Sequence, residues 1–238
     1  MNMPLARRAV AEFLGTGFLV AAVVGSGIMG ARLAAGNVAL ALLANTIATG
    51  AALAALILAL APLSGAHLNP VVSLVDTLEG GLPPREMLPY VLSQALGGIS
   101  GAMLAHLMFG LPLIFFSTKV RSGPAQVLSE FVATFGLILV IRSVSRQSTG
   151  AVAAAVGAYI SAAYWFTAST SFANPAVTIA RAFSDTFAGI RPKDVPWFVL
   201  AEFAGGIAAT LLFRWLAPAA RARVPAASSV QEASDLAR

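Results

Sequence analysis

Two short segments that begin with Asn-Pro constrain the fold of this chain more than any other feature. One begins at Asn69 in the sequence SGAHLNPVV, and the other begins at Asn174 in SFANPAVTIAR. An Asn side chain caps the free N–H groups at a helix start, and Pro at the first helical position gives up an N–H that would lack a partner anyway. The helices predicted at 69–78 and 174–184 are too short, at ~1.5 Å per residue, to cross a bilayer. The sequence therefore predicts two half-helices.

The rest of the chain has the composition of a membrane protein. Hydrophobic residues make up 58% of the 238 residues and charged residues only 11%, and the mean hydropathy is +0.83. This is too little charge to cover a soluble domain, so the expected solvent is membrane lipid. The net charge of +5 comes from scattered residues without interleaved aromatics, which disfavours a nucleic-acid partner. The lack of Cys excludes disulfides and thiolate chemistry, and no cofactor is expected.

Six apolar stretches are long enough to span a membrane. The predicted spans cover residues 9–29, 38–61, 87–109, 126–141, 151–168 and 195–216. Pro62 is expected to end the second span, and a polar connector follows the third. The chain thus divides into a first repeat at 1–118, a second repeat at 119–217 and a cytoplasmic tail at 218–238, which is expected to be disordered.

The two halves of the chain repeat each other. AEFLGT, which contains Glu12, matches SEFVAT, which contains Glu130. YVLSQALGG, which contains Gln94, matches FVLAEFAGG, which contains Glu202. With the Asn-Pro segments, these make three landmarks in the same order. Each half has three spans, an odd number, so the second half enters from the opposite side and the repeat is inverted.

Positive charge favours one orientation. With the N-terminus in the cytoplasm, nine of the 15 Lys and Arg residues fall on the inner side and six on the outer side. Six spans return the chain to its starting side. Both termini are therefore expected in the cytoplasm.

Half-helices that enter from opposite faces bring their N-termini together near the midplane. Non-helical backbone at this depth is tolerated only inside protein or along a water-filled cavity. Each helix N-terminus carries roughly half a positive charge, so the two ends together disfavour cations. The amides of Asn69 and Asn174 can donate hydrogen bonds to a neutral oxygen between them. These features favour a passive pathway for small uncharged solutes.

The two motifs consist of Asn69, Pro70 and Val71, and of Asn174, Pro175 and Ala176. With six spans in inverted halves, they make residues 9–216 resemble the aquaporin, or major intrinsic protein, family. The resemblance implies an all-α integral membrane protein with six transmembrane helices and two re-entrant half-helices, assembled as a homotetramer. It implies that the two Asn side chains orient solutes in single file and that the half-helix dipoles block protons. Val71 stands where relatives usually carry Ala and is expected to bulk the midplane slightly.

The resemblance also gives a role to Glu12 and Glu130. A carboxylate within a span is costly and usually has a function. In relatives these residues accept hydrogen bonds from the backbone of the half-helix loops, which is structural support rather than chemistry.

The same resemblance assigns a selectivity filter. Most relatives carry an Arg directly after the second Asn-Pro-Ala, and here that residue is Val177. Counting back from the Asn residues without gaps assigns the other three positions to Thr49, Ala162 and Ser171. This ring has neither a guanidinium nor an aromatic side chain, so it is expected to be wide and weakly polar.

Arg181 lies one helical turn beyond Val177 and is not expected to replace the missing Arg directly. It can instead pair with Asp185, which follows four residues later on the predicted half-helix.

The filter composition resembles the aquaporin-type channels that are encoded with bacterial arsenic-detoxification genes. This implies a multi-pass protein of the bacterial inner (plasma) membrane that admits glycerol-like polyols, urea, water, and neutral arsenite or methylated arsenicals. The alternative is a secondary transporter with broken helices at the midplane, but no acid lies at the half-helix tips to couple ions. An enzyme is not expected, because Cys is absent and the two His are isolated in sequence.

Overall fold

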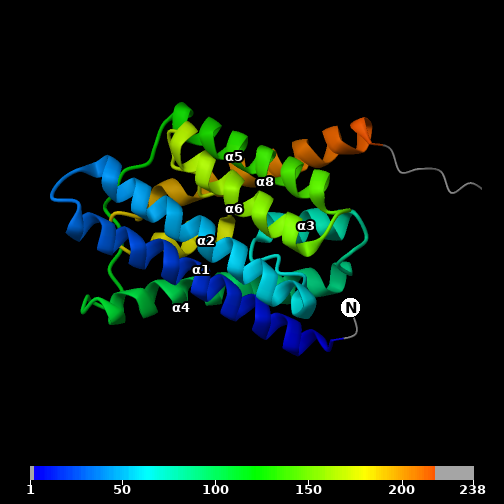
Figure 1. Cartoon of the computed structure of the whole chain (residues 1–238), viewed down its shortest axis with the longest axis horizontal. Helices are drawn as coiled ribbons and strands as arrows, with labels where there is room; N and C mark the ends of the chain where they lie inside the picture. Colours follow the sequence, from blue (N-terminus) through cyan, green and yellow to red (C-terminus); the bar gives the residue numbers. More distant parts are fainter. Residues whose placement is uncertain (1–2, 218–238) are drawn as a thin grey trace, which may run out of the picture.

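The structure, a computed structural model, describes residues 3–217, which form a bundle of helices (Figure 1). The helices long and apolar enough to cross a membrane are α1 (Leu5–Leu33), α2 (Val38–Ser64), α4 (Pro84–Met108), α5 (Pro124–Val144), α6 (Thr149–Phe166) and α8 (Val195–Leu216). The short elements are α3 (Pro70–Leu78), α7 (Pro175–Arg181) and the 3-10 turn η1 (Pro192–Asp194). The predicted fold class, six transmembrane helices with two half-helices, is confirmed. The predicted tail at 218–238 lies outside the described residues.

The helices begin where the sequence supplies caps. The side chains of Asn37 and Ser148 accept hydrogen bonds from the backbone N–H three residues later, at the starts of α2 and α6. One predicted boundary is wrong, because Pro62 lies inside α2 and the helix continues to Ser64. Pro62 has no N–H to donate to the carbonyl of Leu58, so α2 lacks one backbone hydrogen bond there, and it ends at Gly65 in the left-handed conformation (φ 92°).

Two helix pairs pack closely through small residues. A Cβ atom on Gly97 of α4 would collide with the carbonyl oxygen of Phe13 in α1. A Cβ atom on Gly205 of α8 would collide in the same way with the carbonyl oxygen of Phe131 in α5. Small residues allow such close crossing in lipid. The contacts occupy matching positions in the two halves, which supports the proposed division into two repeats.

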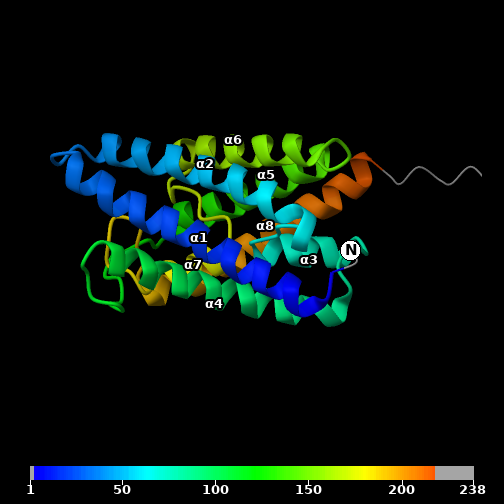
Figure 2. The same ribbon diagram turned by 60° about the horizontal axis from the view of Figure 1, so that its bottom comes forward.

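The half-helices lie among the long helices, with α3 against α4 and α8, and α7 against α1, α4 and α8 (Figure 2). Gly98 of α4 gives room to the backbone of Ala176 in α7, and Gly206 of α8 gives room to Val71 in α3. Val71 is fully buried. Each half-helix is therefore seated partly on a long helix from the other half of the chain.

The start of α1 and the end of α8 lie at one end of the bundle, and the connection between α1 and α2 lies at the opposite end (Figure 1). We call these the proximal end and the distal end. The segment that joins α4 to α5 packs on the chain that follows α7: Ser117 N donates to Ala182 O (2.9 Å), and Arg191 N donates to Lys119 O (2.8 Å). This packing fixes the backbone around the end of α7.

Candidate functional site

The loops that lead into the two half-helices have an uncommon backbone conformation. Within these two loops, φ lies between 49° and 92° at Gly65, Ala66 and Leu68 before α3, and at Thr170, Ser171 and Ala173 before α7. For residues other than Gly this conformation costs roughly 1–3 kcal/mol each and persists only where the surroundings hold it. Its occurrence before both half-helices indicates two loops held in the same way.

Two buried carboxylates hold these loops. Glu12 of α1 accepts hydrogen bonds from the backbone N–H groups of residues 67 and 68 (3.0 and 2.7 Å). Glu130 of α5 accepts them from residues 172 and 173 (2.9 and 2.8 Å). Both carboxylates are fully buried. The two carboxylates engage N–H groups and occupy none of the loop carbonyls, and these contacts fit the predicted support role.

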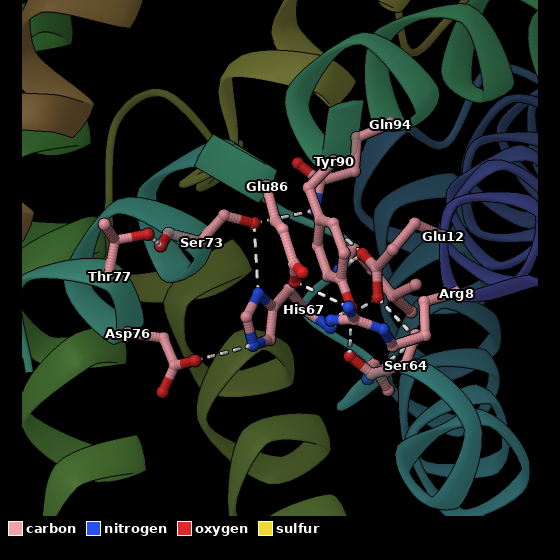
Figure 3. A network of polar contacts seen from close by, with 12 residues as sticks. Arg8, Glu12, Ser64, His67, Ser73, Asp76, Thr77, Glu86, Tyr90 and Gln94 are labelled. Carbon is pink, nitrogen blue, oxygen red and sulfur yellow. Dashed lines mark hydrogen bonds and ion pairs between the residues drawn. The ribbon is translucent and has the colours of Figure 1, made fainter. Parts of the chain in front are cut away.

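Further polar contacts fix the first loop (Figure 3). Gln94 Nε2 donates to Glu12 Oε2 (2.7 Å) and to Ser73 Oγ (2.9 Å). The same Ser73 hydroxyl lies 3.1 Å from His67 Nδ1, and His67 Nε2 lies 3.4 Å from the carboxylate of Asp76. The loop before α3 is thus tied to α1, to α4 and to α3 itself.

Glu202 of α8 occupies the place that Gln94 has in the first half. Its Oε1 accepts hydrogen bonds from Asn174 N (3.2 Å) and Thr178 Oγ1 (2.6 Å). Its Oε2 is buried without a hydrogen-bond partner among residues 3–217. Sequence reasoning used Glu202 only as part of the repeat. The signal that could have identified it is a carboxylate inside a membrane span, at the position where the first half of the chain has the amide of Gln94.

Asn69 and Asn174 meet between the loops, and each bonds to the other half of the chain. Asn69 Nδ2 donates to Ala173 O and Asn174 Nδ2 donates to Leu68 O, both at 2.7 Å. Each Oδ1 caps its half-helix by accepting from the backbone N–H two residues later (2.9 and 3.0 Å). An amide NH2 has two N–H donors. Each Asn therefore keeps one N–H for a molecule beside it.

A cavity with about 120 Å³ of space for water-sized molecules lies between the loops and the long helices. Both Asn residues and the loop residues 65–69 and 171–174 form part of its wall. Apolar side chains of α1, α2, α5 and α6 form much of the rest. The wall therefore combines apolar surface with hydrogen-bonding groups.

Three of the four predicted filter residues, Thr49, Ser171 and Val177, line this cavity. The assignment of the fourth, Ala162, is wrong because its side chain is exposed on α6. The residues of α6 that line the cavity follow one another at a spacing of four: Val152, Val156, Ile160 and Tyr164. Two residues turn a helix by about 200°, so Ala162 falls on the face opposite Tyr164.

Aromatic and guanidinium groups also lie on the cavity wall. Tyr164 donates its hydroxyl proton to Thr49 Oγ1 (3.2 Å), and Phe172 and Arg181 line the same cavity. The cavity as a whole therefore contains aromatic and guanidinium groups in addition to the residues assigned to the ring. Counting residues from the Asn positions does not tell which face of α6 points to the cavity, so it missed Tyr164. The count also ended at Val177, so it did not reach Arg181.

The expected pair between Arg181 and Asp185 does not form. The half-helix predicted at 174–184 ends at Arg181, so residue 185 is not on the same helix. The Asp185 carboxylate instead accepts a hydrogen bond from Thr118 N (2.8 Å) in the segment before α5.

Two capped half-helices that meet inside a six-span bundle, beside a cavity lined by their Asn residues, define a membrane channel of the aquaporin class. A model of the major intrinsic protein family matches residues 1–161. The chain belongs to this family, whose members are channels and not enzymes.

Individual relatives agree with this assignment. The chain is 60% identical over 217 residues to aquaglyceroporin AqpS of Rhizobium meliloti (strain 1021), covering 91% of this chain and 93% of that protein. It is 30% identical over 247 residues to the probable aquaporin AqpM of Archaeoglobus fulgidus, covering 91% and 99%. The solved structure of the aquaglyceroporin from Plasmodium falciparum matches with a TM-score of 0.73 at 21% identity, covering 98% of this chain and 100% of that chain. At this identity the last match supports the fold alone.

Proposed function

We propose that the protein is a passive channel for small uncharged solutes: glycerol-like polyols, urea, water, and neutral arsenite or methylated arsenicals. The observation that carries the proposal is the mixed wall of the cavity. Apolar side chains of four helices face the same space as the loops, the Asn amides and the hydroxyl of Thr49. The carbon atoms of a small polyol can contact the apolar side chains, and its hydroxyl groups can form hydrogen bonds with the polar groups. The name aquaglyceroporin, carried by the relative that is 60% identical, supports this solute class.

In this proposal the side chains have separate roles. Asn69 and Asn174 each present one N–H to a passing solute oxygen, and Glu12 and Glu130 hold the loops that carry them. Thr49, Ser171 and Val177 belong to the selectivity filter. Charged solutes are rejected, because removing an ion from water without partners costs several kcal/mol or more, and the half-helix N-termini disfavour cations.

The arsenic solutes follow from the same chemistry. Neutral arsenite and methylated arsenic acids present hydroxyl groups around a small centre. Their inclusion rests on the resemblance of the Val177 filter to channels encoded with arsenic-detoxification genes.

Replacing Val177 by Arg is expected to lower the flux of glycerol and urea roughly tenfold relative to water, the scale on which one pocket contact discriminates between substrates. The added guanidinium narrows the cavity that Val177 lines and leaves less room for carbon atoms. Val177→Leu is the uncharged control. The measurement is swelling of vesicles in a glycerol or urea gradient and their shrinkage in an impermeant osmolyte, at matched protein density. A wild-type protein that passes water alone would contradict the proposed function. An unchanged solute-to-water flux ratio in Val177→Arg would contradict the filter assignment.

We also propose that both termini lie in the cytoplasm and that the membrane is the bacterial inner membrane. The start of α1 and the end of α8 lie at the same end of the bundle (Figure 1), and the charge distribution favours that end as the inner one. A reporter enzyme fused to Arg238 is expected to be active only on the cytoplasmic side. Reporter activity confined to the outer side would contradict this orientation. The homotetramer stays a prediction, which cross-linking in the membrane tests.

A further inference from the structure

Arg181 lies on the wall of the cavity, at the distal end of α7. Its side chain is 2% exposed and lines the same space as Thr49, Ser171 and Val177. Its Cζ atom lies 3.3 Å from the centre of the Phe172 ring, and its Nε donates to Ala188 O. These two contacts hold the guanidinium in one place.

Within the described part of the chain, no carboxylate pairs directly with Arg181, and the buried acids Glu130 and Glu202 act on its charge only from beyond ion-pair distance. Among residues 3–217, its two Nη atoms have no hydrogen-bond partner, and no carboxylate lies within ion-pair distance. Both Nη atoms also keep some accessible surface, so they remain open to the cavity. A buried cation without a directly paired carboxylate is expensive, and in a membrane protein it usually has a function.

A second guanidinium reinforces this charge. Arg121 Nε donates to Gly189 O (2.8 Å) and its Nη1 donates to Ser169 O (2.7 Å). Its Cζ lies 4.9 Å from the centre of the same Phe172 ring. Burial, followed by the charges of Arg121 and Arg181, lowers the pKa of Lys119 in the adjoining loop to about 8. Arg121 and Arg181 thus place two guanidinium groups over the ring of Phe172, which itself lines the cavity.

We propose that Arg181 is the specificity-determining cation of this channel, and that it acts from one turn beyond the position where Val177 stands. Its free Nη donors bind the oxygen of an entering neutral solute, and its charge repels cations. The inference deepens the proposed function and rests on it. It also means that an uncharged residue at position 177 widens the filter without removing its cation.

The test compares urea with guanidinium, a planar cation of nearly the same shape. Vesicles carrying the purified full-length chain are assayed for the influx of each, and for water flux. Arg181→Gln keeps a donor for Ala188 O but removes the charge, and Arg181→Lys keeps the charge. Arg32→Gln is the matched control, because Arg32 also donates to a carbonyl (Phe109 O, 3.1 Å) and stacks on a ring (5.1 Å), but on the exposed surface.

Arg181→Gln is expected to raise the guanidinium-to-urea permeability ratio at least about tenfold, because a like charge no longer opposes the cation. Arg181→Lys and Arg32→Gln are expected to keep the wild-type ratio, and Val177→Arg combined with Arg181→Gln is expected to restore exclusion. An unchanged ratio in Arg181→Gln, or an equal rise in Arg181→Lys, overturns the inference.

A second variant keeps the test decisive if Arg181→Gln does not insert. Phe172→Leu removes the ring under Arg181 without changing any charge, and the ratio is expected to rise as the guanidinium loses its fixed position. An unchanged ratio in that variant overturns the inference. A wild-type protein that passes water but no urea would instead contradict the proposed function. In that case the influx of guanidinium is compared with the flux of water in each variant.

Discussion

Asn174→Leu is expected to reduce solute flux to the level of vesicles without protein. The substitution removes the N–H offered to the solute, the cap on α7 and the hydrogen bond to Leu68 O. Loss of the cap costs roughly 0.5–2 kcal/mol, and each buried group left without a partner costs a further ~1–3 kcal/mol. Reduced yield in the membrane is therefore expected as well, so flux must be compared at matched protein density.

Two other variants separate the cap from the pore. Asn174→Asp keeps an oxygen that can cap α7, where a negative charge is favourable, but it has no N–H to offer. It is expected to keep the cap and still conduct poorly, with some loss of yield because its second carboxylate oxygen faces Leu68 O. Asn37→Leu removes a comparable cap at the exposed start of α2 (Leu40 N, 3.1 Å), and it is expected to conduct normally. Wild-type conduction by Asn174→Asp would show that the Asn pair is not the site.

Glu12→Gln is expected to destabilise the folded protein by about 3 kcal/mol or more, because hydrogen bonds to a charged group contribute roughly 1.5–3 kcal/mol each. The Glu12 carboxylate accepts four of them, including one from Ser64 Oγ (2.6 Å). An amide offers a single acceptor oxygen and turns its NH2 towards the remaining donors. Glu130→Gln is expected to act in the same direction, with loss of yield rather than a change of solute preference. Yield and thermal stability in detergent measure the effect.

Glu202→Gln is the matched comparison, and it is expected to be neutral or stabilising. One oxygen of Glu202 accepts two hydrogen bonds and the other has no partner among residues 3–217. Gln94 shows that an amide fits the corresponding place in the first half. A loss as large as that of Glu12→Gln would mean that the negative charge of Glu202 is itself required.

Local signals in the sequence were sufficient to predict the half-helices. Asn69 and Asn174 start them through their own side chains and the Pro that follows, which depends on nothing distant in the chain. The carboxylates Glu12 and Glu130 could be chosen because burying an acid in a span needs a reason. The structure places both against the loops they were expected to hold.

Other parts of the site depend on contacts that a sequence does not show. The rotation of α6, which puts Tyr164 on the cavity and Ala162 on the surface, is set by packing against α2 and α5. The early end of α7 at Arg181 follows from backbone contacts with the segment around Ser117, more than 60 residues earlier in the chain. The position of the Arg181 guanidinium follows from that early end.

The crossed hydrogen bonds of the two Asn residues have a consequence for biosynthesis. The ribosome delivers Leu68 and Asn69 long before Ala173 and Asn174, so the first half enters the bilayer with a carbonyl and an amide whose partners do not yet exist. Polar groups without partners in hydrocarbon cost several kcal/mol each. The centre of the channel is therefore completed only when the second half docks. A chain that stops after its first three spans carries an exposed polar defect that distinguishes it from the finished protein.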